Sequence, residues 1–153
     1  MSIFVVIHKE RKEKDYRMII VPSGRSKIGI GQMKDYGIIS YLGKGEEEKI
    51  GEYTKFLITG IMEDFQYVEM LDDFLLEIKK VDTGKQKETE WDGQAFQHKI
   101  NKKKVELTHT IFGECEEYPK WSCKFDDYKK VLYGWAKFLK MPESLKTKLE
   151  IEI

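Results

Sequence analysis

A chain of 153 residues, 41 % hydrophobic and 35 % charged, is the size of one folded domain and can bury a core without a disulfide framework or a structural metal. We therefore expect a single domain over residues 1–153. Lys plus Arg and Asp plus Glu both number 27, and this zero net charge disfavours a nucleic-acid-binding domain. The apolar runs are too short to span a bilayer. The N-terminal apolar run precedes the basic residues, the reverse of a secretory signal, so we expect a cytoplasmic protein.

The charges are unevenly distributed along the chain. Residues 46–77 sum to −8, whereas residues 1–45 sum to +5, residues 78–104 to +4 and residues 105–153 to −1. A neutral protein with one acidic block can present a negative surface to a basic partner.

The first 45 residues predict strands and turns. Residues 3–8 and 16–21 are rich in β-branched residues and predict an antiparallel hairpin. Residues 23–45 contain six glycines and predict loops, with a short strand possible at 36–42. This stretch lacks the third glycine of a dinucleotide motif and the Gly-Lys-Ser/Thr ending of a P-loop, so it does not predict a nucleotide site.

Two helices are expected in the acidic block, because apolar residues there recur at helical spacing. The first begins at Glu46 and the second covers residues 67–80, although residues 74–81 could also form a strand. Asp72 and Asp73 lie opposite the apolar face of the second helix. The two apolar stripes are Ile50, Tyr53, Phe56, Leu57 and Ile61, and Tyr67, Leu71, Phe74, Leu75 and Ile78.

Period-two alternation at residues 95–100 and 105–111 predicts a second hairpin, with residues 85–92 as a polar connector before it. His98 and His109 fall on the same face of this hairpin. Two imidazoles make an incomplete metal site, so we interpret them as polar residues on a solvated sheet face.

Residues 113–122 predict a loop, and an Asp at Phe125-Asp126-Asp127 is the expected N-cap of a last helix. Trp135 belongs to the apolar stripe of this helix and should be buried, whereas Trp121 lies in the polar loop and should be exposed. Gly134 suggests that another element crosses close to the helix. Residues 148–153 alternate again and predict a terminal edge strand. These elements together predict an α+β fold, with an antiparallel sheet of about five or six strands packed against two or three helices.

No catalytic, metal or cofactor motif is present, and we expect neither enzymatic activity nor a bound cofactor. Cys115 and Cys123 should be reduced thiols, and no local motif pairs them with a histidine. A small enzyme or a nucleic-acid-associated protein is the alternative. The latter would use Lys102-Lys103-Lys104 and Lys99 on phosphates.

Protein binding is the leading hypothesis, because acids steer a basic partner and aromatic residues anchor it. The candidate partner-binding residues are the acidic and aromatic ones of the block and of the later loop: Glu46, Glu47, Glu48, Glu52, Asp72, Asp73, Glu114, Glu116, Glu117, Tyr118 and Trp121.

Two stretches carry a family resemblance. In IISYLGKGEEEKIGEYTKFLITGI, the core Glu48-Lys49-Ile50-Gly51 is similar to a Glu-Glu-Ile-Gly helix start. The second, WDGQAFQHKI…VELTHTIFGE…W…FDDYKKVLYGWAKFL, places a hairpin before a helix with a central Trp. Together they resemble the small immunity proteins of bacterial polymorphic-toxin and contact-dependent growth-inhibition systems. The resemblance implies a non-enzymatic cytoplasmic protein that binds and blocks a cognate toxin domain, often a nuclease. The neutral charge of the chain adds that no nucleic-acid partner is expected. It assigns no binding residues, because contact surfaces vary between pairs.

Overall fold

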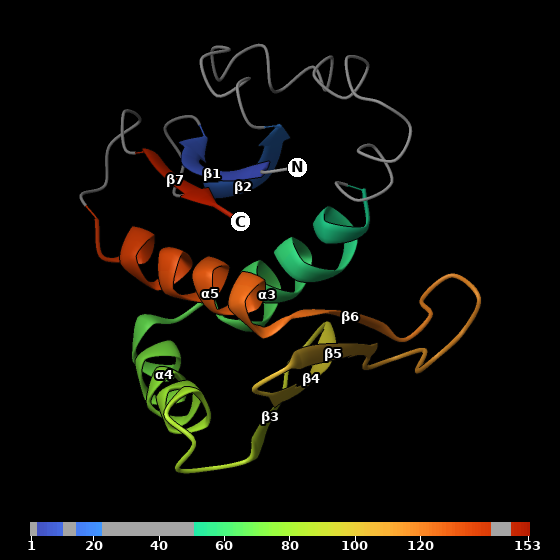
Figure 1. The fold of residues 1–153 in the computed structure, drawn as a ribbon. Coiled ribbons are helices and arrows are strands. Elements are labelled where there is room, and N and C mark those ends of the chain that lie inside the picture. Colours follow the sequence, from blue (N-terminus) through green and yellow to red (C-terminus); the bar gives the residue numbers. More distant parts are fainter. Residues whose placement is uncertain (1–2, 11–14, 23–50, 142–147) are drawn as a thin grey trace.

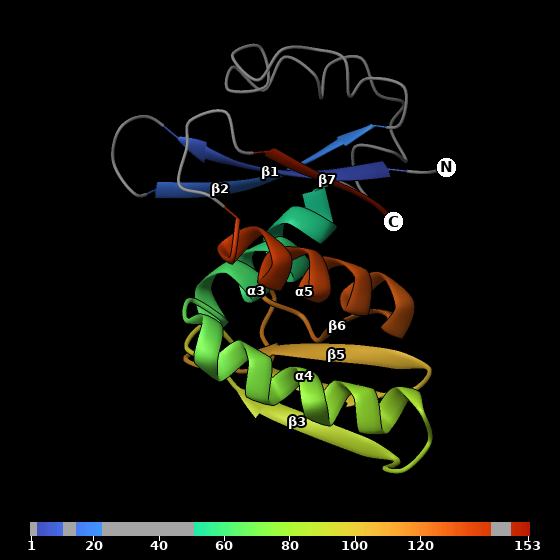
Figure 2. The same cartoon turned by 90° about the vertical axis from the view of Figure 1, so that its left-hand side faces the viewer.

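Helices lie between two antiparallel sheets in this protein (Figures 1 and 2). The computed structural model describes residues 3–10, 15–22, 51–141 and 148–153. The glycine-rich segment, the possible strand at 36–42 and the acidic residues Glu46, Glu47 and Glu48 lie outside the described residues.

The first sheet is built from the two ends of the chain. β1 (Ile3–Glu10) pairs with β2 (Asp15–Pro22) as the predicted antiparallel hairpin. β7 (Lys148–Glu152) pairs with the other side of β1, which gives the order β2-β1-β7. The predicted terminal edge strand is therefore confirmed.

The predicted helices of the acidic block are both present. Gly51 and Glu52 open a helical run that continues as η2 (Tyr53–Ile58), a π-helical segment, and as α3 (Thr59–Asp64). The second helix is α4 (Val68–Asp82), which excludes the strand alternative for its second half. Most of the predicted apolar stripe faces inward, because Phe56, Leu57, Ile61, Leu71, Phe74 and Ile78 are all buried. Tyr67 was expected in the second stripe but is exposed, because it lies before the first turn of α4 in extended backbone.

The second sheet has the order β3-β4-β5-β6 and is antiparallel throughout. Its centre is the predicted hairpin of β4 (Phe96–Asn101) and β5 (Lys104–His109). Asn101 Oδ1 shapes the turn by accepting hydrogen bonds from the backbone N–H groups of Lys103 and Lys104. The flanking strands β3 (Glu88–Asp92) and β6 (Trp121–Lys124) lie where a connector and a loop were expected.

The last helix, α5 (Phe125–Leu139), begins directly after β6. Its N-cap is Lys124, not the expected Asp; Asp126 and Asp127 lie instead in the first turn, where carboxylates favour the helix dipole. Trp135 is buried as predicted, and its Nε1 donates a hydrogen bond of 2.7 Å to the Phe65 carbonyl.

Close packing at Gly134 joins α5 to the first sheet. A Cβ at this position would overlap the Ile151 side chain of β7, so an element does cross close to Gly134, as expected. α5 therefore contacts both sheets, whereas α4 packs beside β3 and α5.

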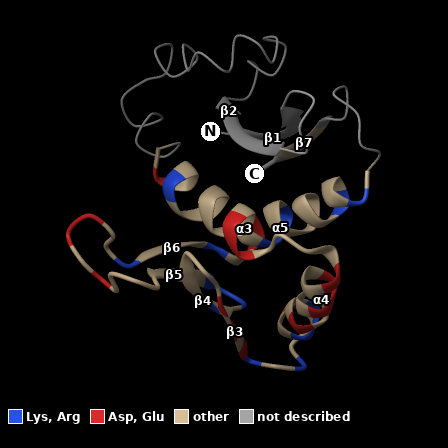
Figure 3. Cartoon of the chain, turned by 180° about the vertical axis from the view of Figure 1, so that it is seen from behind, with Lys and Arg blue, Asp and Glu red and all other residues tan. Residues whose placement is uncertain are grey.

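The α+β class is confirmed, but the predicted sheet differs from the one observed. The seven strands of the described residues are divided into sheets of three and four, and neither reaches the predicted five or six. The connection between β5 and β6 projects from the edge of the second sheet, as the view from behind shows (Figure 3).

Candidate protein-binding surface

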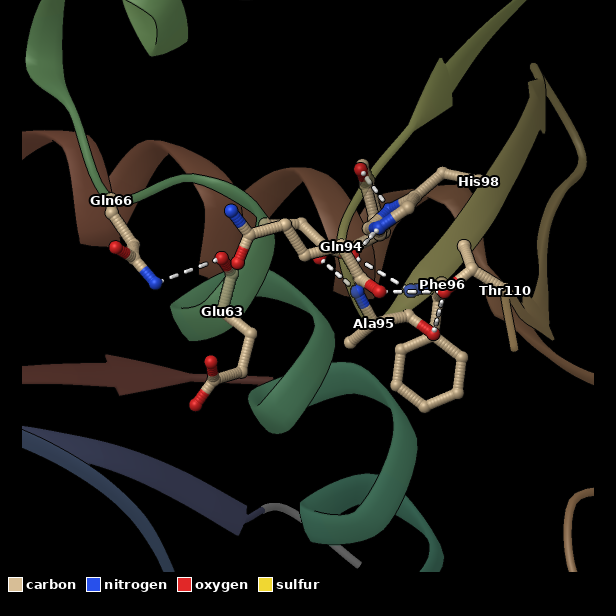
Figure 4. Close-up of polar contacts among 9 residues, drawn as sticks. Glu63, Gln66, Gln94, Ala95, Phe96, His98 and Thr110 are labelled. Carbon is tan, nitrogen blue, oxygen red and sulfur yellow. Dashed lines mark hydrogen bonds and ion pairs between the residues drawn. The ribbon is translucent and has the colours of Figure 1, made fainter. Parts of the chain in front are cut away.

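A buried polar network lies at the centre of the molecule. The Asp64 carboxylate, at the end of α3, accepts hydrogen bonds from the backbone N–H groups of Ala95 (2.7 Å) and Phe96 (3.1 Å) and lies 2.7 Å from His98 Nε2 (Figure 4). His98 Nδ1 lies 2.9 Å from the Tyr128 hydroxyl of α5. All these groups are satisfied when Nε2–H donates to Asp64 and the Tyr128 hydroxyl donates to Nδ1, and we assign this tautomer.

The network is structural, because a reactant cannot reach it. His98 and Tyr128 are 0 % exposed and Asp64 is 3 % exposed. Burial raises the pKa of Tyr128 well above its usual value, so its hydroxyl remains a donor. The predicted alternation of the hairpin is correct, but the expectation that His98 faces solvent is wrong: its face of the sheet is the one that α3 and α5 cover.

His109, at the end of β5, organises the β5–β6 loop (residues 110–120). Its Nδ1 accepts hydrogen bonds of 3.2 Å from the backbone N–H groups of Ile111 and Phe112. Its ring stacks on Phe112, with the centroids 4.9 Å apart, and lies 4.3 Å from the Tyr118 ring. Thr110 attaches the loop to the β3–β4 turn, because its hydroxyl donates a 2.6 Å hydrogen bond to the Gln94 carbonyl (Figure 4).

The π-helical segment η2 supports the other limb of this loop. Lys55 Nζ lies 4.5 Å from the Tyr118 ring centroid and donates a hydrogen bond to the Glu117 carbonyl. Phe56 lies edge-on to the Tyr118 ring, with the centroids 6.4 Å apart. The loop is thus held at both ends by ordered side chains, and π-helical turns are frequent at functional sites.

Trp121 does not belong to the exposed part of this region, contrary to expectation. It lies in β6, is 9 % exposed and stacks on Phe56 at 5.3 Å with an interplanar angle of 8°. Its Nε1 donates a 3.3 Å hydrogen bond to Glu52. Trp121 has no periodic partner in the sequence because β6 has only four residues.

The exposed part of the loop combines apolar and acidic side chains. Ile111 is 77 % exposed and Phe112 is 63 % exposed. Three glutamates, Glu114, Glu116 and Glu117, follow them in the same loop. Figure 3 shows these acidic positions on the part of the loop that projects furthest.

The predicted partner-binding residues are not all brought together. Glu114, Glu116, Glu117 and Tyr118 share the β5–β6 loop, and Glu52 lies beneath it through its contact with Trp121. Asp72 and Asp73 lie on α4, on the other side of the molecule from the loop (Figure 3). Asp72 is also paired there with Lys140 at 2.8 Å. Among the described residues of the acidic block, Asp72 and Asp73 therefore do not share a surface with the loop.

Sequence reasoning missed Ile111 and Phe112 as surface residues. The alternation through Ile111 extended the predicted strand to that residue, whereas β5 ends at His109. The signal that could have identified them is the pair of consecutive apolar residues directly before Gly113, which has a left-handed φ of 61°.

In the part of the chain that the structure describes, the histidines and cysteines belong to no cluster that could hold a metal ion. His98 lies opposite Leu107 in the strand register, and His109 lies opposite Phe96. Burial raises the pKa of the Cys123 thiol to about 12, and Cys115 Sγ accepts a 3.4 Å hydrogen bond from the Tyr118 N–H. Both cysteines are free thiols.

Comparison with known proteins gives no relative for this chain: no family model matches it, and no curated protein or solved structure is significantly similar. None of the helices in the described residues is long and apolar enough to cross a membrane.

Proposed function

We propose that this chain is a non-enzymatic binding protein whose β5–β6 loop engages a partner protein. The observation that carries the proposal is the exposure of Ile111 (77 %) and Phe112 (63 %) on a braced loop that also carries three glutamates. The partner that fits this surface is a basic protein with an apolar recess. Together with the family resemblance of the sequence, this favours an immunity protein that blocks a cognate toxin domain, such as a nuclease, by steric occlusion in the bacterial cytoplasm.

Three physical arguments support the loop as the contact. Adjacent large apolar side chains gain free energy when a partner removes them from water. Aromatic anchors near the centre of an interface carry much of its affinity, and charges at the rim mainly accelerate encounter. The hydrogen bonds of His109 and Lys55 hold the loop before binding, which reduces the entropy lost on association.

The alternative functions have less support. The acid–histidine–hydroxyl set of Asp64, His98 and Tyr128 is sealed from solvent, so it does not favour hydrolysis. At the β5–β6 loop itself, the three carboxylates would repel nucleic-acid phosphates.

The proposal can be tested with the product of a toxin gene next to the gene for this chain. Binding is measured by calorimetry and protection by growth of cells that express the toxin. Ile111→Ser combined with Phe112→Ser should raise Kd by a factor of about 30 or more, because both anchors are lost. Leu76→Ser is the matched control, since Leu76 is 62 % exposed on α4 and away from the loop.

The loop glutamates should affect the rate of association more than the affinity of the anchored complex. Reversal of Glu114, Glu116 and Glu117 to Lys should slow association at low salt and affect dissociation less. A loop variant that binds and protects like wild type, while Leu76→Ser weakens both, would contradict the proposal.

A further inference from the structure

Lysines face one another at the end of the second sheet that lies away from the β5–β6 loop. Lys104 of β5 and Lys124 of β6 are direct partners in the strand register. Both are exposed, and they alternate with the buried Val105 and Cys123, so they share the outer face of the sheet. Lys103 precedes Lys104 in the hairpin turn and is also exposed.

The positive charge of this group is incompletely neutralised. Like charges directly opposite each other on neighbouring strands repel. Lys104 has a partner in Glu106 at 2.7 Å, but among the described residues no carboxylate pairs with Lys103 or Lys124. Lys124 is also the N-cap of α5, where the helix dipole is positive and a cation is unfavourable.

A shallow hollow that is widely open to solvent lies at the same place. It is lined by Lys103, Lys104, Lys124 and Ser122, together with Tyr53 and Cys123, and no carboxylate lines it. The Tyr53 hydroxyl is directed to Asp127, to which it donates a 2.7 Å hydrogen bond.

We propose that this hollow, the lysine site, binds a phosphate group between Lys104 and Lys124. Ammonium groups of lysine bind phosphate as point charges, and the Ser122 hydroxyl supplies a neutral donor. The bound anion would be attracted by both lysines, although Lys104 would share its charge between the anion and Glu106, which lies opposite Ser122. This site does not depend on the proposed function, because β5 separates it from the β5–β6 loop by roughly 17–20 Å.

The test compares thermal unfolding in phosphate and in chloride at equal pH and ionic strength. In chloride, Lys124→Gln should leave Tm unchanged or raise it, because it removes a repulsion. In phosphate, the same substitution should lower Tm relative to wild type, because it removes half of the site. Lys130→Gln on α5 is the matched control and should behave alike in both salts, since Lys130 is exposed and does not line the hollow.

NMR titration identifies the source of the phosphate group. Inorganic phosphate should cause saturable shifts of the Ser122 and Lys124 amide signals, and Lys104→Gln should raise the apparent Kd roughly tenfold. A single-stranded oligonucleotide tests whether a phosphodiester binds in its place; saturable binding of either probe at these amides supports the site. Equal Tm changes in both salts, with no saturable shift by either probe, would overturn it. Neither result alters the toxin-binding test, which uses Ile111 and Phe112.

Discussion

Asp64 connects three elements of the fold. It lies at the end of α3, bonds to the start of β4, and reaches Tyr128 of α5 through His98. Its carboxylate accepts three hydrogen bonds in a site that is 3 % exposed. The β3–β4 turn leaves room for it only because residue 93 is Gly: a Cβ there would overlap the carboxylate. Hydrogen bonds to a buried charged group are strong, and removing one partner leaves donors unsatisfied.

We expect Asp64→Asn to destabilise the fold by about 3 kcal/mol, because its amide N–H₂ would face backbone donors that now bind an oxygen. Chemical denaturation measures the loss. Asp72→Asn is the control: Asp72 pairs with Lys140 on the surface, and its loss should cost less than about 1 kcal/mol. Equal losses for the two variants would show that the buried network does not stabilise the fold.

A second prediction concerns His109 and the loop that it supports. His109→Phe keeps an aromatic ring against Phe112 and Tyr118 but removes the Nδ1 acceptor. We expect the Ile111 and Phe112 amides to exchange with solvent several-fold faster, because their hydrogen bonds are lost. Hydrogen exchange followed by NMR checks this, with the β4 amides as an internal reference. Unchanged exchange at residues 111 and 112 would mean that His109 does not hold the loop tip.

At the scale of elements, the spacing of apolar residues predicted a helix or strand correctly wherever one face of that element is buried over several residues. α4, β4 and β5 are such cases, and the apolar residues within them face inward as expected, whereas Tyr67, just before α4, does not. β3 and β6 were missed for physical reasons. In β3 only Thr89 and Trp91 face inward, and they alternate with the exposed acids Glu88, Glu90 and Asp92. Because acidic residues are uncommon in strands, the segment resembles a polar connector. β6 is too short to show a period. The division into two sheets depends on long-range pairing that no local pattern encodes.

Gly134 provides a test of packing against helix propensity. Propensity alone favours Ala in α5 by about 1 kcal/mol, but the added methyl would overlap Ile151 of β7. We therefore expect Gly134→Ala to destabilise the protein by about 1–3 kcal/mol. Gly51→Ala is the opposite control, because Gly51 is helical and a Cβ added there would have no neighbour within 4 Å among the described residues.

The same substitution in a second background identifies the cause. In Ile151→Ala protein, Gly134→Ala should be neutral or stabilising, because the overlapping atoms are gone. Equal effects in both backgrounds, measured by urea denaturation, would exclude the contact with β7 as the reason for the glycine.

At the scale of the whole molecule, the sequence predicted a binding surface made of acidic and aromatic residues. It did not predict which of these residues lie on the same surface. Glu114, Glu116, Glu117 and Tyr118 share one loop, whereas Asp72 and Asp73 proved to lie on a different side. The −8 sum over residues 46–77 does not identify one surface, because it adds Glu52, which contacts Trp121 beneath the loop, to Asp72 and Asp73 on α4. His98 illustrates the same limit: a polar residue in an alternating strand is buried only when distant residues, here Asp64 and Tyr128, satisfy it.

Stability should fall at alkaline pH because buried acids keep their protons in the folded state. Burial raises the pKa of Cys123 from 9.0 to about 12 and raises that of Tyr128 well above 10.0. The folded protein therefore binds more protons than the unfolded chain above pH ~9, and each such group lowers the free energy of unfolding by up to about 1.4 kcal/mol per pH unit. Below pH ~8 neither group contributes a slope. Urea denaturation between pH 7 and 10.5 measures this, and Cys123→Ala should flatten the curve between pH ~9 and 10 while the steeper fall above pH ~10 persists. An unchanged slope in that variant would mean that Cys123 releases its proton equally in both states and is more accessible than its position in β6 indicates.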